Sequence, residues 1–322
     1  MSDQKAIAES SPGFLTAPGF DLEQKSFVGC GYDANFQRID QSLRGSHQTV
    51  VDPIDPKGLR RALWWRRKFA TFGRNPVPLR LRGTTVYLGH YTEHFGHWLL
   101  ESLGRLWDPD VIARADHLVF HPFLHPSPAG PADYGPMKWV IEALNLRPER
   151  IRLLHRAAIC ETLLVPKPLV LINEKATPEA GPFYRRLRDS AVSGLDPGRD
   201  TARKLLISRM GSPNRDWARD QELEEVAAAK GFEIVTPQDL PFVEQVRLFA
   251  QAETIVGRAG SGLHNIVFSR TGTRCLCLGG GTENLRNQRI AAEISGALHQ
   301  ECELPGEEID LAAWFDGQVA SS

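Results

Sequence analysis

The sequence ETIVGRAGSGLHNIVF, residues 253–268, decides how the second half of the chain is expected to fold. A short β-like run leads through Gly257, Gly260 and Gly262 directly into an apolar helical segment. Glycine lets the backbone approach a ligand closely, and a helix N-terminus offers N–H groups to an anion. The spacing GxxGxG is not the dinucleotide fingerprint, and the Lys-Ser/Thr pair of a P-loop is missing. The turn therefore predicts either a phosphate-binding loop or a packing turn without a ligand.

Strands and helices alternate regularly around this turn. The pattern predicts strands at 204–208, 232–236, 253–257 and 274–279, with helices between them. Such alternation is typical of βαβ units in a parallel sheet, whose ligands bind beyond the carboxyl ends of the strands. We therefore expect a ligand site at that edge of the sheet.

The first half of the chain alternates less regularly. Strands are predicted at 84–89, 117–121 and 161–166, with a helix after the first and another before the third. Residues 1–80 mix Pro and Gly with short apolar pieces, which predicts an irregular entry with a few short strands. The fold class is therefore α/β.

A Pro-rich stretch around residues 175–200 is typical of a junction between domains. A chain of 322 residues is long enough for two domains with separate cores. We expect an N-terminal domain over 1–185 and a C-terminal domain over 186–322. The second should end in a helix that packs near the junction.

Composition argues against several classes of function. The net charge of -1 provides no general basic field, so nucleic acid is not an expected partner. The five cysteines include no CxxC pair, which disfavours a disulfide framework or a zinc ribbon. No signal peptide or transmembrane segment is recognisable, so the expected location is cytoplasmic, with peripheral membrane association left open. The basic run RRALWWRRKF, residues 60–69, is either a nucleic-acid or membrane patch or an amphipathic edge of the core, and receives no function.

Arginines follow the first strand of the second half, in SRMGSPNRDWARDQEL, residues 208–223. A guanidinium group binds phosphate oxygens with two parallel hydrogen bonds, so Arg209 at the strand end suits a diphosphate. Arg215 is a second candidate, whereas Arg219 is better explained as a solvated surface residue. The helix that follows is expected to be capped by Asp220.

A polar helix face is predicted in YTEHFGHWLLESLGRLW, residues 91–107. The side chains of His97, Glu101 and Arg105 are four residues apart and share one face, with His94 one turn earlier. The opposite face, with Leu99, Leu103 and Leu106, should turn inward. A histidine and a carboxylate can supply a general base. A metal site that includes His90, or a purely structural polar face, are the alternatives, although the HExxH zinc signature is absent.

Three segments in this order resemble glycosyltransferase family 61: FGHWLLESLGRL, then residues 205–257 from LLISRMGSPNRD to AETIVG, then GRAGSGLHNIVFSRTGTRCLCL. The resemblance covers roughly residues 84–107 and 203–279. It implies a GT-B fold with two Rossmann-like domains facing a central cleft. It also implies a nucleotide-sugar donor, here UDP-linked, in the second domain, a glycan or glycoconjugate acceptor, and inversion at the anomeric carbon.

The family's functional positions transfer to specific residues of this chain. Its histidine and acidic residue correspond to His97 and Glu101, although the family usually has Asp where this chain has Glu101. It also usually has His where this chain has Ala259, a loss that Arg258 or His264 could offset. The expected donor site comprises Arg209, Arg215, Gly257, Arg258, Gly260, Ser261, Gly262, Leu263, His264 and Glu283, and the expected acceptor side comprises His94 and Arg105.

An inverting transfer needs a base for the acceptor hydroxyl and positive charge for the departing diphosphate. Glu101 is the predicted base, with His97 as its partner or substitute. No cofactor and no metal are expected. One alternative is a catalytically inactive glycan- or nucleotide-binding protein on the same fold, and another is an oxidoreductase, which the missing GxGxxG disfavours.

Overall fold

The computed structural model describes residues 7–15, 20–21, 26–27, 31–32, 79–122, 130–155, 158–194, 202–210, 217–279 and 285–321. The basic run 60–69 lies outside these ranges. The chain divides into two compact units: unit 1 is Met1–Ile141 with Asn145–Ile172, and unit 2 is Glu142–Leu144 with Asn173–Ser322. The boundary expected at residues 185 and 186 falls inside helix α5 (Ala180–Val192), all of which belongs to unit 2.

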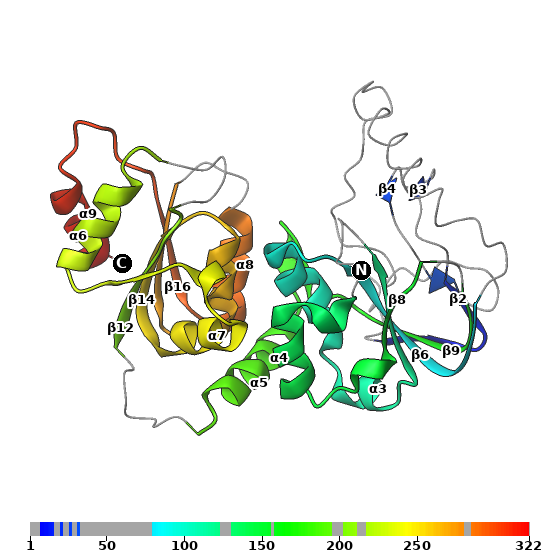
Figure 1. Cartoon of the computed structure of the whole chain (residues 1–322). Coiled ribbons are helices and arrows are strands. Elements are labelled where there is room, and N and C mark those ends of the chain that lie inside the picture. The colour runs from blue at the N-terminus through cyan, green and yellow to red at the C-terminus, as the bar shows by residue number, and fades with distance from the viewer. Residues whose placement is uncertain are drawn as a thin grey trace, which may run out of the picture. The chain divides into compact units, whose positions relative to one another are not determined.

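Unit 1 is built on one mixed sheet whose strands run in the order β5-β2-β9-β6-β7-β8, with β1 added beside β9 (Figure 1). Strands β6 to β9 pair in parallel, whereas β1 and β2 run antiparallel to β9 and β5 runs antiparallel to β2. Their bounds are β1 Ile7–Ser10, β2 Gly13–Leu15, β5 Gly31–Tyr32, β6 Leu79–Tyr91, β7 His117–Pro122, β8 Ile151–Leu153 and β9 Ala158–Pro166. The three strands predicted in this half are confirmed.

The remaining elements of the first 172 residues are short. They are β3 Phe20–Asp21, β4 Ser26–Phe27, α2 Phe95–His97, η2 Trp98–Ser102, η3 Leu103–Leu106, α3 Pro109–Ala113, η4 Pro131–Asp133, α4 Gly135–Ala143, η5 Pro148–Arg150 and β10 Val170–Leu171. The helix predicted after β6 is continuous from Phe95 to Leu106, but its hydrogen bonding passes from α to π to 3₁₀. Asp108 caps the next helix, because its Oδ1 accepts from the N–H groups of Asp110 (3.0 Å) and Val111 (3.1 Å).

Strand β6 is interrupted twice, and each interruption carries a glycine. Its pairing register shifts between Leu81 and Thr84 and between Tyr87 and His90, and Gly83 and Gly89 have φ of 74° and 77°. These are bulges that bend the strand before it delivers the chain to the helix at Phe95.

We expect Gly89→Ala to lower the free energy of unfolding by about 1 kcal/mol, because φ of 77° lies in the left-handed region that side chains disfavour. An added Cβ would lie 3.4 Å from Arg105 Nε, which is ordinary contact, so the cost is conformational. Urea titration measures it. Gly135→Ala, where an added Cβ meets nothing within 4 Å, is the matched control, and equal stability of the two variants would contradict the assignment.

Unit 2 is built on a five-stranded sheet in the order β13-β12-β14-β15-β16, parallel throughout. The strands are β12 Arg203–Ile207, β13 Glu233–Val235, β14 Ala252–Arg258, β15 Arg274–Leu278 and β16 Leu298–Cys302, and a short β11 covers Lys175–Ala176. The helical elements are α5, α6 Asp220–Ala229, η6 Pro237–Asp239, α7 Phe242–Gln251, η7 Ser261–Phe268, α8 Leu285–Ser295 and α9 Leu311–Ser321. The four predicted strands are confirmed, and β16 is an addition.

Helices cover both faces of this sheet (Figure 1). On one face, α6 and α9 enclose an apolar core that contains Leu206, Val256 and Leu276, and the Phe232 and Phe315 rings meet edge to face 5.2 Å apart. On the other face, α7, η7 and α8 pack together, and α5 packs against all three. The central strands β12, β14 and β15 are therefore mostly buried from both sides, which explains the apolar runs KLLI and TIVG.

The strand order of unit 2 creates a topological switch point. From β12 the chain passes to β13 on one side and then returns to β14 on the other. In doubly wound α/β sheets, ligands bind outside the carboxyl ends of the two strands where the order reverses. Here these strands are β12 and β14, which end at Ile207 and Arg258. Within the described parts of the chain, no helix is long and apolar enough to span a bilayer.

Candidate functional site

The carboxyl ends of β12 and β14 bring Arg209 and the glycine loop, residues 257–262, together. Ile207 and Gly257 are paired in register, so the residues that follow them emerge side by side. The Arg209 Nη1 group donates a hydrogen bond to the carbonyl oxygen of Ala259. A Cβ added to Gly260 would collide with the same guanidinium group. Arg209 therefore lies in direct contact with the loop.

Two of the three loop glycines are explained by close packing. A Cβ at Gly257 would lie 3.0 Å from both Ile207 Cβ and Leu263 Cδ2. Gly260 has φ of 169°, an extended conformation open to any residue, so the nearby guanidinium group is what requires the absence of a side chain. At Gly262 the nearest atoms would be 3.6 Å away, which is ordinary contact.

Arg258 is held by a buried carboxylate. Its Nη1 group forms an ion pair with Asp220 Oδ2, and the exposed fractions of the two side chains are 16% and 8%. The same carboxylate oxygen accepts from the Trp217 N–H at 3.0 Å, and the N-cap position of α6 is Arg219. The prediction that Asp220 caps α6 was therefore wrong: its side chain neutralises Arg258 instead. Of the two residues that could replace the missing family histidine, Arg258 is already engaged.

The other predicted donor residues occupy the first turns of η7. The helix begins at Ser261, is 3₁₀ in type, and runs to Phe268. Leu263 is buried with 1% exposure, and His264 retains 8%. Arg215 and Glu283 lie outside the described residues.

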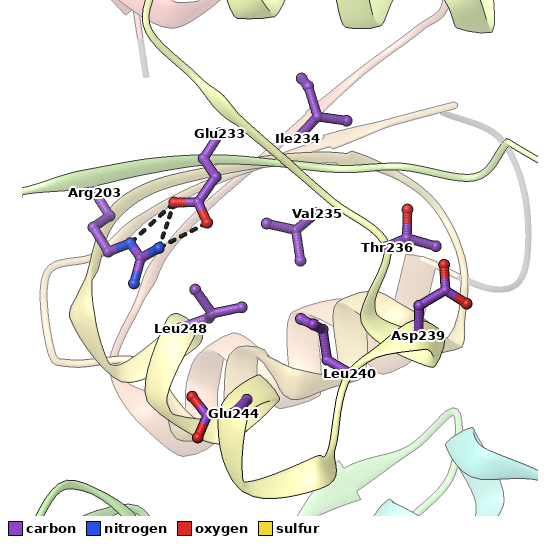
Figure 2. Close-up of a pocket in the computed structure, with 9 residues that line it drawn as sticks. All are labelled: Arg203, Glu233, Ile234, Val235, Thr236, Asp239, Leu240, Glu244 and Leu248. Atoms are coloured by element: carbon purple, nitrogen blue, oxygen red, sulfur yellow. Dashed lines mark hydrogen bonds and ion pairs between the residues drawn. The ribbon is translucent and has the colours of Figure 1, made fainter.

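A cavity of about 390 Å³ lies elsewhere in unit 2, between edge strand β13 and helix α7 (Figure 2). An ion pair of Arg203 with Glu233 closes one end, where Arg203 Nη2 is 2.7 Å from Glu233 Oε1. The rest of the lining is mixed: Val235, Leu240 and Leu248 are among its apolar residues, and Thr236, Asp239 and Glu244 are polar or charged. None of the predicted donor residues lines this cavity, so it is separate from the candidate site.

The predicted catalytic pair, His97 and Glu101, is in contact in unit 1. His97 Nδ1 and Glu101 Oε2 are 2.5 Å apart, on side chains that keep 26% and 15% exposure. An ionised carboxylate only accepts hydrogen bonds, so the imidazole N–H is the donor in that state. His94 is exposed one turn earlier, with its ring 5.1 Å from that of His97. This arrangement can place either the carboxylate or the remaining imidazole nitrogen against a hydroxyl group.

The leucine face of the same helix is buried as predicted, but the position of Arg105 differs from the prediction. Leu99, Leu103 and Leu106 are buried, with exposures of 0 to 1%. Arg105 is also buried, at 4%, so the expectation that it stays on an outward polar face was wrong. A side chain this buried is not available to an acceptor.

Arg105 instead forms a buried hydrogen bond with the sheet of unit 1. Its Nη1 group donates to the Pro166 carbonyl at 2.6 Å, at the end of β9. Burial lowers the pKa of Arg105 to about 10, and the fields of Tyr87 and Glu101 act in the opposite direction. The electrostatic interaction with Glu101 connects this buried cation to the candidate base.

A buried Tyr–His pair lies close by and was not anticipated from the sequence. The Tyr87 hydroxyl group and His121 Nδ1 are 2.8 Å apart, and the His121 ring is 6.2 Å from that of His90. The pair joins β6 to β7. The only indication of it in the sequence is a polar residue within each of two otherwise apolar strands. Within the described ranges, His, Cys, Asp and Glu side chains form no group of three or more that could hold a metal ion.

Comparison with known proteins adds a family to this geometry. The model of glycosyltransferase family 61 matches residues 95–276, more than half of the chain. The match begins at the helix that carries His97 and Glu101 and ends within β15. A comparison with curated proteins found no match. Because a family model matches more than half of the chain, the chain belongs to glycosyltransferase family 61.

Proposed function

We propose that this chain is an inverting glycosyltransferase that moves a sugar from a UDP-linked donor to a hydroxyl group of a glycan or glycoconjugate. Family membership implies glycosyltransferase activity. The observation that carries the finer proposal is the contact of Arg209 with the glycine loop at the switch point between β12 and β14.

The donor half of the proposal concerns the leaving group. As the bond from the anomeric carbon to the diphosphate oxygen breaks, negative charge builds on UDP. A guanidinium group and helical N–H groups that point at this charge stabilise the transition state more than the ground state. The Arg209 guanidinium group lies at the loop, where it donates to the Ala259 carbonyl, and the first N–H groups of η7 have no partner within the helix.

The acceptor half concerns the proton. In our proposal Glu101 takes the proton of the acceptor hydroxyl as its oxygen attacks the anomeric carbon, and His97 orients the carboxylate through their 2.5 Å contact. The oxygen attacks from the side opposite the leaving diphosphate, so the configuration inverts. Neither half of the proposal includes a metal or a cofactor.

An inactive nucleotide- or glycan-binding protein remains the second candidate, and one observation favours it. The family histidine is replaced by Ala259, and Arg258 is neutralised by Asp220 rather than available to a phosphate. Such a protein would bind UDP but transfer nothing.

One experiment separates these readings. The purified protein is mixed with a panel of UDP sugars and glycan acceptors, UDP release is measured, and the anomeric configuration of the product is determined by NMR. We expect release of UDP, an inverted product, and a raised melting temperature with UDP, because a ligand at 100 times its Kd adds about 2.7 kcal/mol to stability. A retained configuration would contradict the mechanism, and UDP binding without turnover would select the binding protein. No binding of any nucleoside diphosphate would reject the donor site.

A further inference from the structure

A buried amide side chain forms a hydrogen bond with the glycine loop. Gln288, on α8, has 0% exposure, and its Nε2 group donates to the Gly260 carbonyl oxygen at 3.0 Å. The same oxygen accepts from the Leu263 N–H at 3.1 Å. The Gly260 carbonyl therefore points into the interior of unit 2, toward α8.

The direction of this carbonyl fixes the direction of the next N–H. A trans peptide unit is planar, and its C=O and N–H bonds point to opposite sides. Because the Gly260 carbonyl points toward Gln288, the N–H of Ser261 points away from the interior. Ser261 is the first residue of η7, where a free N–H and the positive end of the helix dipole favour an anion.

A second amide acts on the following turn. Asn265, also 0% exposed, donates through Nδ2 to the Gly262 carbonyl at 3.2 Å and to Gln245 Oε1 at 3.0 Å. Gln245 in turn donates to the Leu240 carbonyl at 3.1 Å, so the network extends to α7. Two buried amide side chains, Gln288 and Asn265, thus bond to carbonyl groups of one loop, and a third, Gln245, bonds to Asn265.

Retaining these amides has a free-energy cost that apolar residues would avoid. Gln288 Oε1 is buried, and no described residue donates a hydrogen bond to it. A buried unsatisfied acceptor destabilises the folded state, whereas Met would fill similar space without that penalty. Among the described residues, what Gln288 gains in return is its bond to the Gly260 carbonyl.

We infer that Gln288 is a positioning residue that orients the Gly260–Ser261 peptide unit so that the Ser261 N–H binds the diphosphate of the donor. Asn265, which also bonds to Gln245, holds the Gly262 carbonyl of the next peptide unit, whose Leu263 N–H donates to the Gly260 carbonyl within the turn. The inference rests on the proposed function, because it assumes that the loop receives a diphosphate. Gln288 itself does not touch the donor.

The test compares UDP with uridine, which lacks the phosphates. Gln288→Met removes the N–H donor at nearly constant volume, and calorimetry of the full chain should show a loss of UDP affinity of about threefold to tenfold, the value of one neutral hydrogen bond. Affinity for uridine should not change. Gln288→Asn keeps an amide but is one methylene too short to reach Gly260, so it should give the same loss, and it serves if the Met variant does not fold.

Ser295→Ala is the matched control on the same helix. Ser295 is also buried, but its hydroxyl group donates to carbonyls of its own helix, at Ala291 and Ala292, so UDP affinity should be retained. If both Gln288 variants bind UDP as the wild type does, the inference is overturned while the donor site stands. If their affinities for UDP and uridine fall together, the role of Gln288 is structural and the inference is also overturned. If the wild-type protein does not bind UDP, the proposed function fails, and the inference fails with it.

Discussion

Replacing Glu101 with Gln should lower kcat by roughly 10²- to 10⁴-fold while the affinity for UDP stays unchanged. The substitution keeps the shape and the hydrogen-bond reach of the side chain but removes the ability to accept a proton. Since His97 Nδ1 lies 2.5 Å from the carboxylate, the imidazole should stay in place beside the amide. The measurement is steady-state turnover with saturating donor, together with calorimetric binding of UDP.

Two further variants make this prediction specific. Glu142→Gln removes a carboxylate from the exposed surface of α4 and should leave turnover unchanged. If Glu101→Gln stays active while His97→Ala is inactive, the base is the histidine and Glu101 orients it. Full activity in both variants would mean that this helix is structural.

Arg105 shows where sequence periodicity stops being informative. The four-residue spacing places its Cα on the same helix face as His97 and Glu101, and this was readable from the sequence. Its burial depends on a carbonyl at Pro166, which is 61 residues later in the chain, and on a bulge that brings Gly89 against the guanidinium group. Such distant partners leave no local pattern.

The same distinction applies to unit 2. Strands β12, β14 and β15 were predictable because both of their faces are largely buried, so each reads as an apolar run. Strand β16, LHQEC, is an edge strand with a mostly half-buried surface, and its polar letters concealed it. Likewise, glycine spacing indicated a loop for an anion, but the engagement of Arg258 by Asp220 depends on a residue 38 positions earlier.

Arg209→Ala should weaken UDP binding by about tenfold to 150-fold, the value of hydrogen bonds to a charged group, and leave uridine binding unchanged. Arg203→Ala is the matched control. Arg203 is the first residue of β12, and Arg209 follows the last residue of that strand. Arg203 therefore lies at the amino end of the strand, away from the glycine loop, where it forms an ion pair with Glu233. Its removal should not alter UDP affinity, and an equal loss in both variants would mean that general positive charge, rather than the site, attracts the diphosphate.

Gly260→Ala tests the same contact from the other side. The extended φ of 169° accepts alanine without backbone strain, so the folded state should keep its stability. The new methyl group would occupy the position of the Arg209 guanidinium, which must then leave the loop. UDP affinity should fall nearly as far as in Arg209→Ala. The double variant should be no weaker than Arg209→Ala alone, because the methyl group has nothing left to displace. If the losses of UDP affinity in the two single variants add up in the double variant, the loop and the arginine act separately. The contact between them would then not be part of the donor site.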